Sequence, residues 1–177
     1  MKEIIFSIML WINNSTGYSI PDTPNIKFLE TMDLRSYAYG CELTPIPNQN
    51  KEICAAKENW DLDSGNPVAL YDHTNKTIIL NKNFDIQTTH DKSVLFHELV
   101  HHMQYENDID STVECVGELE KEAYKLQDEW LQEKYNVTVW DTIKMNRLFF
   151  LTITSCMEDH WSQYNDYNSY YNLAEWL

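Results

Sequence analysis

The stretch Ser93–Gln104 (SVLFHELVHHMQ) holds an H-E-x-x-H motif, in which His97, Glu98 and His101 are set among bulky uncharged residues. No proline or glycine interrupts the stretch, so it is free to form a helix. Residues four apart lie on one face of a helix, and the two histidines can therefore offer imidazole nitrogens to one metal ion. Glu98 would lie beside that ion without binding it, where a carboxylate can accept a proton from water and pass one to a leaving group. The motif therefore predicts a zinc site on this helix.

A zinc site of this kind requires a third protein ligand, and the helix predicted for Thr112–Tyr135 offers several glutamates. Apolar residues recur through this helix at helical spacing and predict one buried stripe, formed by Val116, Leu119, Ala123, Leu126 and Trp130. Glu118 and Glu122 lie on one flank of the stripe, whereas Glu120 lies on the other flank with Gln127. Spacing alone therefore leaves three candidates for the third ligand.

The composition describes a globular and strongly acidic chain. With 177 residues, of which 43% are hydrophobic and 13% aromatic, the chain is long enough for one domain with its own core. Its formal net charge is −15, which opposes binding to nucleic acid and to anionic lipid surfaces. We therefore expect no nucleic-acid partner and no stable membrane insertion of the mature chain.

The N-terminal residues Met1–Ser19 have features of a signal peptide. Lys2 supplies a single positive charge before the short apolar run Ile4–Ile12, and polar and small residues follow this run. The run is too short to span a bilayer. We predict cleavage that leaves a single domain at 20–177, beginning near Ile20, and export to the periplasm or the extracellular space. An ordinary first strand or helix is the alternative.

The four cysteines form no C-x-x-C pair, which disfavours a cysteine zinc knuckle. In an exported protein their even number permits two disulfides, with three possible pairings, whereas a cytosolic protein would keep them as buried thiols. The sequence does not choose among the pairings of Cys41, Cys54, Cys115 and Cys156.

A hairpin is predicted just before the motif helix. Its strands, Val68–Tyr71 and Thr77–Leu80, flank the turn-forming segment Asp-His-Thr-Asn. The motif helix would follow, with Thr89 or Asp91 as its N-terminal cap. These elements together predict a small antiparallel sheet beside the motif helix, and hence an α+β fold.

The rest of the chain is less strongly patterned. A short strand is expected at Ile26–Leu29, a short helix at Asp33–Tyr39 and a third long helix at Asp141–Thr154. The region 44–66 is rich in loop-forming residues, and the tail 158–177 is aromatic and polar. No repeat and no linker divides the chain, so we expect a single domain.

An H-E-x-x-H motif followed by a glutamate-bearing helix resembles the gluzincin group of zinc peptidases, whose third ligand is a glutamate about twenty residues downstream. Glu120 lies 19 positions after His101, and Glu122 lies 21 positions after it. The segment Glu120-Lys121-Glu122-Ala123-Tyr124 also resembles the Glu-x-x-Ala-Asp pattern of the prenyl-protein-processing members, with Tyr124 in place of the aspartate. The resemblance implies Glu120 as the third ligand, before Glu122 and then Glu118. It leaves Tyr124, Glu118 and Gln127 as candidates to orient a ligand histidine.

A closer resemblance covers residues 26–131. The segments HELVHHMQ (97–104) and CVGELEKEAYKLQ (115–127), with the preceding hairpin, resemble small bacterial metallopeptidase-like proteins in a domain family of unknown function. This resemblance implies zinc and a zincin-like peptidase fold, but it does not indicate a substrate.

The expected function is that of a zinc-dependent peptidase acting on peptide or protein substrates, with Glu98 as general base. The strand Thr77–Leu80 would pair with an extended substrate backbone if it borders the cleft. A hydrogen-bond donor for the developing oxyanion is also needed, and the candidates are His160, Tyr124 and Tyr105. Gln104 is a candidate to support a ligand, whereas His102 and His73 are not expected to bind the metal.

Two other classes of function stay open. The chain could be a catalytically inactive zinc-binding scaffold that serves as a binding or inhibitor module, although a structural zinc site has no need of Glu98. It could also be a metal-free interaction protein that uses its aromatic tail. Zinc content separates the metal-free interaction protein from the peptidase and the scaffold. Peptide turnover then separates the peptidase from the scaffold.

Overall fold

The computed structural model describes residues 1–38 and 68–156. Several sequence-based predictions lie outside these ranges, namely the roles of Cys41, Cys54 and His160, the loop-rich region 44–66 and the aromatic tail. The described residues form an α+β arrangement with a three-stranded sheet and several helices, so the predicted class is confirmed.

The helix that carries the H-E-x-x-H motif, α4 (Thr89–Glu106), is the centre of the fold. It contacts the helices α1 (Lys2–Thr16), α5 (Val116–Tyr135) and α6 (Val139–Ile143) and the strand β2 (Ala69–Asp72). All twelve residues of Ser93–Gln104 are buried. A helix that is surrounded by other elements requires mostly apolar residues on all sides, which this stretch supplies around its polar motif. Its N-terminal cap is Thr88, whose side chain accepts a hydrogen bond from the Asp91 backbone, and not Thr89 or Asp91 as predicted.

The sheet contains β1 (Asn25–Leu29), β2 (Ala69–Asp72) and β3 (Thr77–Asn81) in the order β1-β3-β2. β2 and β3 form the predicted antiparallel hairpin, but β1 joins β3 in parallel, so the sheet is mixed and not antiparallel throughout as predicted. β3 is therefore the central strand, with both of its edges paired. This corrects the expectation that Thr77–Leu80 could pair with a substrate, because its backbone groups already bond to neighbouring strands.

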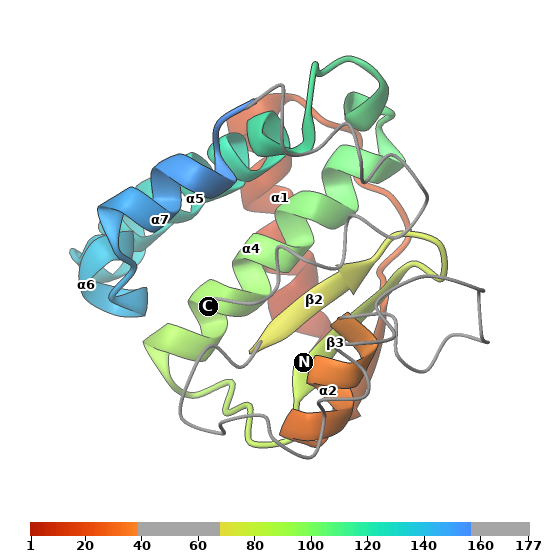
Figure 1. Cartoon of the computed structure of the whole chain (residues 1–177). Coiled ribbons are helices and arrows are strands. Elements are labelled where there is room, and N and C mark those ends of the chain that lie inside the picture. The colour runs from red at the N-terminus through yellow and green to blue at the C-terminus, as the bar shows by residue number, and fades with distance from the viewer. Residues whose placement is uncertain (39–67, 157–177) are drawn as a thin grey trace, which may run out of the picture.

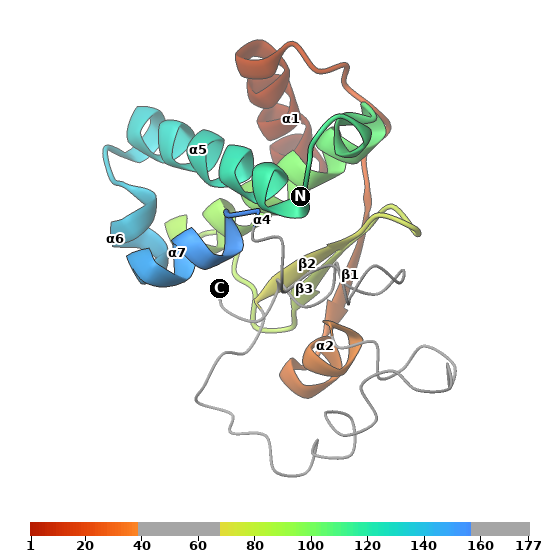
Figure 2. The same ribbon diagram turned by 45° about the horizontal axis from the view of Figure 1, so that its top comes forward.

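Side chains alternate across the sheet and cover both of its faces. Ile78 and Leu80 of β3 belong to the main core with α4, whereas Ile79 and Leu70 pack against α2 (Thr31–Ala38). Figure 2 shows the resulting layers, with α2 on one side of the sheet and α4 on the other, followed by α1 and α5.

The N-terminal segment forms helix α1 (Lys2–Thr16), which packs against α4. Its inner face, made of Ile5, Ile8, Met9 and Ile12, is part of the main hydrophobic core. The segment thus has the helical form that was the alternative to a signal peptide, and removing it would expose core side chains to water. Cleavage and export themselves stay predictions.

The second glutamate-bearing helix is α5 (Val116–Tyr135), preceded by the short helix η2 (Ile109–Ser111). The predicted buried stripe is confirmed at Leu119, Ala123, Leu126 and Trp130, and Val116 is partly buried.

The predicted third helix is instead two short ones, α6 (Val139–Ile143) and α7 (Arg147–Ile153). The break occurs where Lys144 adopts a left-handed conformation and the side chain of Asn146 caps α7.

A disulfide joins Cys115, at the start of α5, to Cys156, which follows α7. Gly117 lies in the first turn of α5, and a Cβ atom there would come within 3.0–3.1 Å of the backbone at Thr154 and Ser155. The start of α5 is therefore held closely against the end of α7. Within the two described ranges, no helix combines the length and hydrophobicity needed to cross a bilayer.

Candidate metal centre

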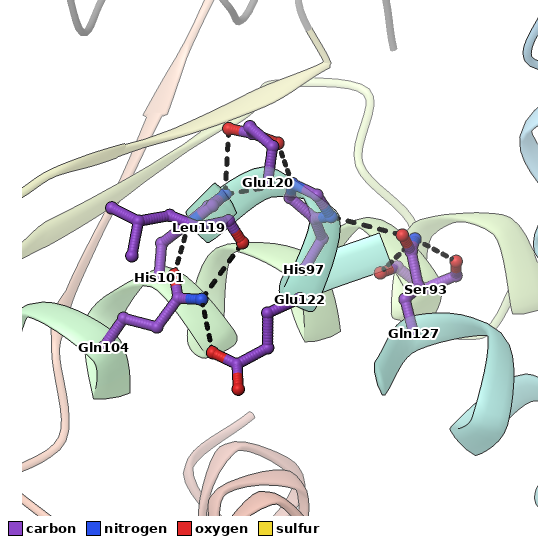
Figure 3. A network of polar contacts seen from close by, with 8 residues as sticks. All are labelled: Ser93, His97, His101, Gln104, Leu119, Glu120, Glu122 and Gln127. Atoms are coloured by element: carbon purple, nitrogen blue, oxygen red, sulfur yellow. Dashed lines mark hydrogen bonds and ion pairs between the residues drawn. The ribbon is translucent and has the colours of Figure 1, made fainter. Parts of the chain in front are cut away.

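Three side chains from α4 and α5 converge in the interior. His97 and His101 project from adjacent turns of α4, and Glu120 reaches them from α5 (Figure 3). The two Nε2 atoms are 3.0 Å apart, and Glu120 places Oε2 at 3.2 Å from Nε2 of His97 and Oε1 at 3.2 Å from Nε2 of His101. Within residues 1–38 and 68–156, this is the one set of three potential metal ligands whose donor atoms lie within 4.8 Å of one another.

The spacing of these donors fits a small tetrahedral cation. Donors bound at about 2.0–2.1 Å to a tetrahedral ion lie roughly 3.3–3.4 Å apart. The observed separations of 3.0–3.2 Å are within a few tenths of an ångström of that value. Two imidazoles and one carboxylate are also a donor set of catalytic zinc sites. The residues present therefore fit a metal ion of this kind.

The side chain of Gln127 fixes the tautomer of His97. Its amide nitrogen donates to the backbone oxygen of Ser93 at 2.9 Å and to the Ser93 hydroxyl at 2.6 Å. Its amide oxygen must then face His97, whose Nδ1 lies 3.2 Å away and donates to it. The proton on Nδ1 leaves the lone pair of Nε2 free to point into the cluster.

Gln104 does the same for His101. The amide nitrogen of Gln104 donates to the backbone oxygen of Leu119 at 3.0 Å and to Oε2 of Glu122 at 2.9 Å. Its amide oxygen lies 2.8 Å from Nδ1 of His101 and accepts the proton there. Both histidines therefore direct Nε2 lone pairs toward one point, an arrangement that requires a positive charge between them.

The pKa shifts within the cluster also indicate that a positive charge belongs between its donors. Burial lowers the pKa of His101, but attraction to Glu120, a hydrogen bond with it and the charge of Glu98 outweigh burial and raise that pKa to about 9. Burial raises the pKa of Glu120, yet the two histidines outweigh it and hold that pKa far below its usual range. Without a metal ion, a proton on His101 supplies the positive charge that the carboxylate favours.

Glu98 lies next to this cluster but is not one of its donors. Its side chain is 4% exposed, and burial raises its pKa above the usual range of a carboxyl, although His97 and His101 act in the opposite direction. The backbone N–H of Tyr71 donates a hydrogen bond to its carboxylate. Glu98 is thus a buried carboxyl group beside the cluster, and its burial raises its pKa.

The register of the hairpin explains why Tyr71 can donate outward. Asn81 donates to the Val68 oxygen at 2.9 Å, so hydrogen-bonded pairs alternate along the hairpin from that point. Tyr71 lies opposite Ile78 in a pair without mutual hydrogen bonds, and its N–H and C=O point away from β3. The free edge of β2 is therefore the edge that faces Glu98.

The other predicted site residues on α5 differ in how they relate to the cluster of His97, His101 and Glu120. The Tyr124 ring packs 4.3 Å from His97, centroid to centroid, and burial followed by Glu120 and Glu98 raises its pKa well above the usual value. Glu122 supports Gln104 rather than joining the cluster, and Glu118 is exposed.

The remaining candidates lie outside the cluster. His102 bonds through its ring nitrogens to the Tyr71 hydroxyl and the Asp22 backbone oxygen, as expected of a residue that does not bind the metal. His73 stacks on Tyr105, whose ring also packs near Tyr71.

Sequence patterns missed three contributors to the centre. Ser93 and the backbone N–H of Tyr71 act through groups that many residues could supply, so no motif marks them. Tyr18 donates to Glu122 from a position 104 residues earlier, and only the folded chain brings the two together.

The described residues thus define an α+β protein with a buried candidate metal centre between two helices and a sheet edge. The chain belongs to the family described as Domain of unknown function (DUF6647), whose family model matches residues 1–147. The match includes α1, the sheet and both helices of the centre. It agrees with the resemblance to a domain family of unknown function. No curated protein and no solved structure matches the chain significantly.

Proposed function

We propose that the protein is a zinc-dependent peptidase with a gluzincin-like centre and a zincin-like fold. His97, His101 and Glu120 would hold the ion, which leaves one position for water or substrate. The chemistry that bound zinc supplies is Lewis acidity, which polarises a substrate carbonyl and makes a water molecule more acidic. The observation that carries the proposal is a buried carboxylate, Glu98, beside the three donors and not among them.

Glu98 would act as the general base and then as the acid. A raised pKa makes its carboxylate a stronger base toward an attacking water molecule, and the proton can then pass to the leaving amine. The backbone N–H of Tyr71 faces this carboxylate and would help to orient it. A site that only stabilised the fold would gain nothing from a buried carboxylate at this position.

An extended peptide could pair with β2. Among the described residues, no strand pairs with the outer edge of β2, and this edge lies beside α4. Ala69 shares the outward orientation of Tyr71, so its N–H and C=O are directed to the same side. Pairing with the Ala69 backbone and the Tyr71 C=O would align a substrate with Glu98, which the Tyr71 N–H already meets. The sequence had suggested this role for the neighbouring strand.

Tyr124 is the described residue best suited to donate a hydrogen bond to a developing oxyanion. Its ring packs against His97, and its raised pKa keeps the hydroxyl protonated at neutral pH. A protonated phenol near the reacting carbonyl stabilises negative charge as it forms.

A specific observation favours one rival, the zinc-binding scaffold without turnover. The three donor residues are only 2–8% exposed, as in structural zinc sites that are closed to substrate. A peptidase would need the centre to open during the reaction.

Peptide hydrolysis by the zinc-loaded protein decides between these functions. The wild type should cleave members of a broad peptide library, and Glu98→Gln should bind zinc normally but lose activity by about a hundredfold or more. Glu118→Gln, which alters an exposed carboxylate on α5, is the control and should retain activity. A wild type that holds zinc and cleaves nothing, or a Glu98→Gln variant with full activity, would overturn the proposal.

A further inference from the structure

A chain of hydrogen bonds leads from His101 to the N-terminal part of the molecule. Gln104 accepts from His101 and donates to Glu122, as described above. Both carboxylate oxygens of Glu122 in turn lie within reach of the Tyr18 hydroxyl, at 2.7 and 2.9 Å. Tyr18 follows α1 and belongs to neither helix of the centre.

Glu122 and the Leu119 carbonyl together determine which way the Gln104 amide faces. If that amide rotated by half a turn, its oxygen would meet the Leu119 carbonyl and the Glu122 carboxylate, which are both acceptors. Its nitrogen would then face Nδ1 of His101 and favour the tautomer whose Nε2 carries the proton. A fixed Glu122 therefore keeps the lone pair of His101 available to a metal ion.

Tyr18 is well placed to fix Glu122 because the residues that follow it are anchored to α4 and its C-terminal cap. Ser19 and Asn107 exchange hydrogen bonds of 2.8 and 3.0 Å, and the Asp22 oxygen lies 2.8 Å from Nε2 of His102. These contacts hold residues 18–22 against the C-terminal half of α4.

We propose that Tyr18 and Glu122 are positioning residues of the metal centre, and that zinc affinity depends on the contact of their side chains. The inference rests on the proposed zinc site. Neither residue touches the metal, and their effect passes through Gln104 to His101. The segment that follows α1 thereby contributes to a centre built from α4 and α5.

The test is zinc affinity of the full chain, measured by competition with a chromophoric chelator at neutral pH. Glu122→Ala should weaken binding by about tenfold or more, the lower range for residues that orient a ligand. Tyr18→Phe should weaken it by a smaller factor of the same sign. Glu122→Gln keeps an acceptor for Gln104 and should restore most of the affinity. Glu118→Ala, on the exposed part of α5, is the matched control and should bind as the wild type does.

A double-mutant cycle distinguishes positioning from general destabilisation. Because Tyr18 acts through Glu122, Tyr18→Phe should have no further effect on zinc affinity in the Glu122→Ala background. Independent, additive losses would overturn the inference, and so would unchanged affinity in both single variants. Far-UV circular dichroism of each metal-free variant reports whether it is folded, and a loss of affinity that follows only unfolding also overturns it. A wild type that binds no zinc would refute the proposed function, and this inference with it.

Discussion

In the metal-free protein, His101 holds its proton more tightly than a free histidine, since the ion pair with Glu120 raises its pKa to about 9. A folded-state pKa above the unfolded value of about 6.5 stabilises the fold fully below that pH. The contribution is lost as the pH rises through the folded value. The lowered pKa of Glu120 affects stability at the acidic end of the pH range. Its contribution to the free energy of unfolding is lost only as the pH falls through this lowered pKa.

We therefore expect the free energy of unfolding of the metal-free protein to decrease between about pH 6.5 and 9.5. Urea titrations of chelator-treated protein across this range measure the effect. Glu120→Gln removes the negative partner of His101 and should flatten the dependence. A metal-free wild type whose stability is constant or rises over the range would contradict the assigned ion pair.

The sequence identifies single residues of the centre to different degrees. His97, Glu98 and His101 follow from spacing within one helix, where geometry is local. The choice of Glu120 over Glu122 required a resemblance, because both lie on the same helix and only its packing against α4 determines which one enters the cluster. The glutamines were candidates by their type, but the direction of their amides depends on carbonyls and hydroxyls from other turns.

At the scale of elements, helix α1 is an integral part of the core. Ile12 is fully buried, whereas Leu10 on the same helix is 42% exposed. Ile12→Ala should lower the free energy of unfolding by about 2–4 kcal/mol, through lost burial and an unfilled cavity. Leu10→Ala, the matched control, should change it by less than about 0.5 kcal/mol. Equal and small effects would show that α1 does not pack as described.

This packing gives the predicted cleavage near Ile20 a structural consequence. A chain cut there would lack both the apolar face of α1 and the Tyr18 hydroxyl that contacts Glu122. The mass of the protein from its native host shows whether residues 1–19 are retained.

Elements with local signals were predictable, and their long-range arrangement was not. The hairpin and the helices 89–106 and 116–135 have periodic patterns and turn residues that specify them. The parallel pairing of β1 with β3 depends on contacts some fifty residues apart, with Asn25 opposite Thr77, and no local pattern encodes it. That pairing leaves β2 as the free edge beside α4.

At the scale of the whole molecule, the fold brings α4, α5 and the edge of β2 together at one buried point. α1 packs against α4 (Figure 1), and Tyr18, which follows α1, contacts Glu122 of α5. The overall charge of −15 favours the approach of cations. A metal centre is the feature that these elements jointly support.

Zinc content per chain tests that centre most directly. Elemental analysis of protein reconstituted with zinc and freed of excess metal should give about one ion per chain for the wild type and for Glu98→Gln, as expected of one tetrahedral site. The double variant His97→Ala/His101→Ala should retain almost none. His90→Ala, at the first turn of α4 and outside the cluster, is the control and should keep its zinc. Full occupancy in the double variant, or none in the wild type, would contradict the assignment of His97, His101 and Glu120 as the metal ligands.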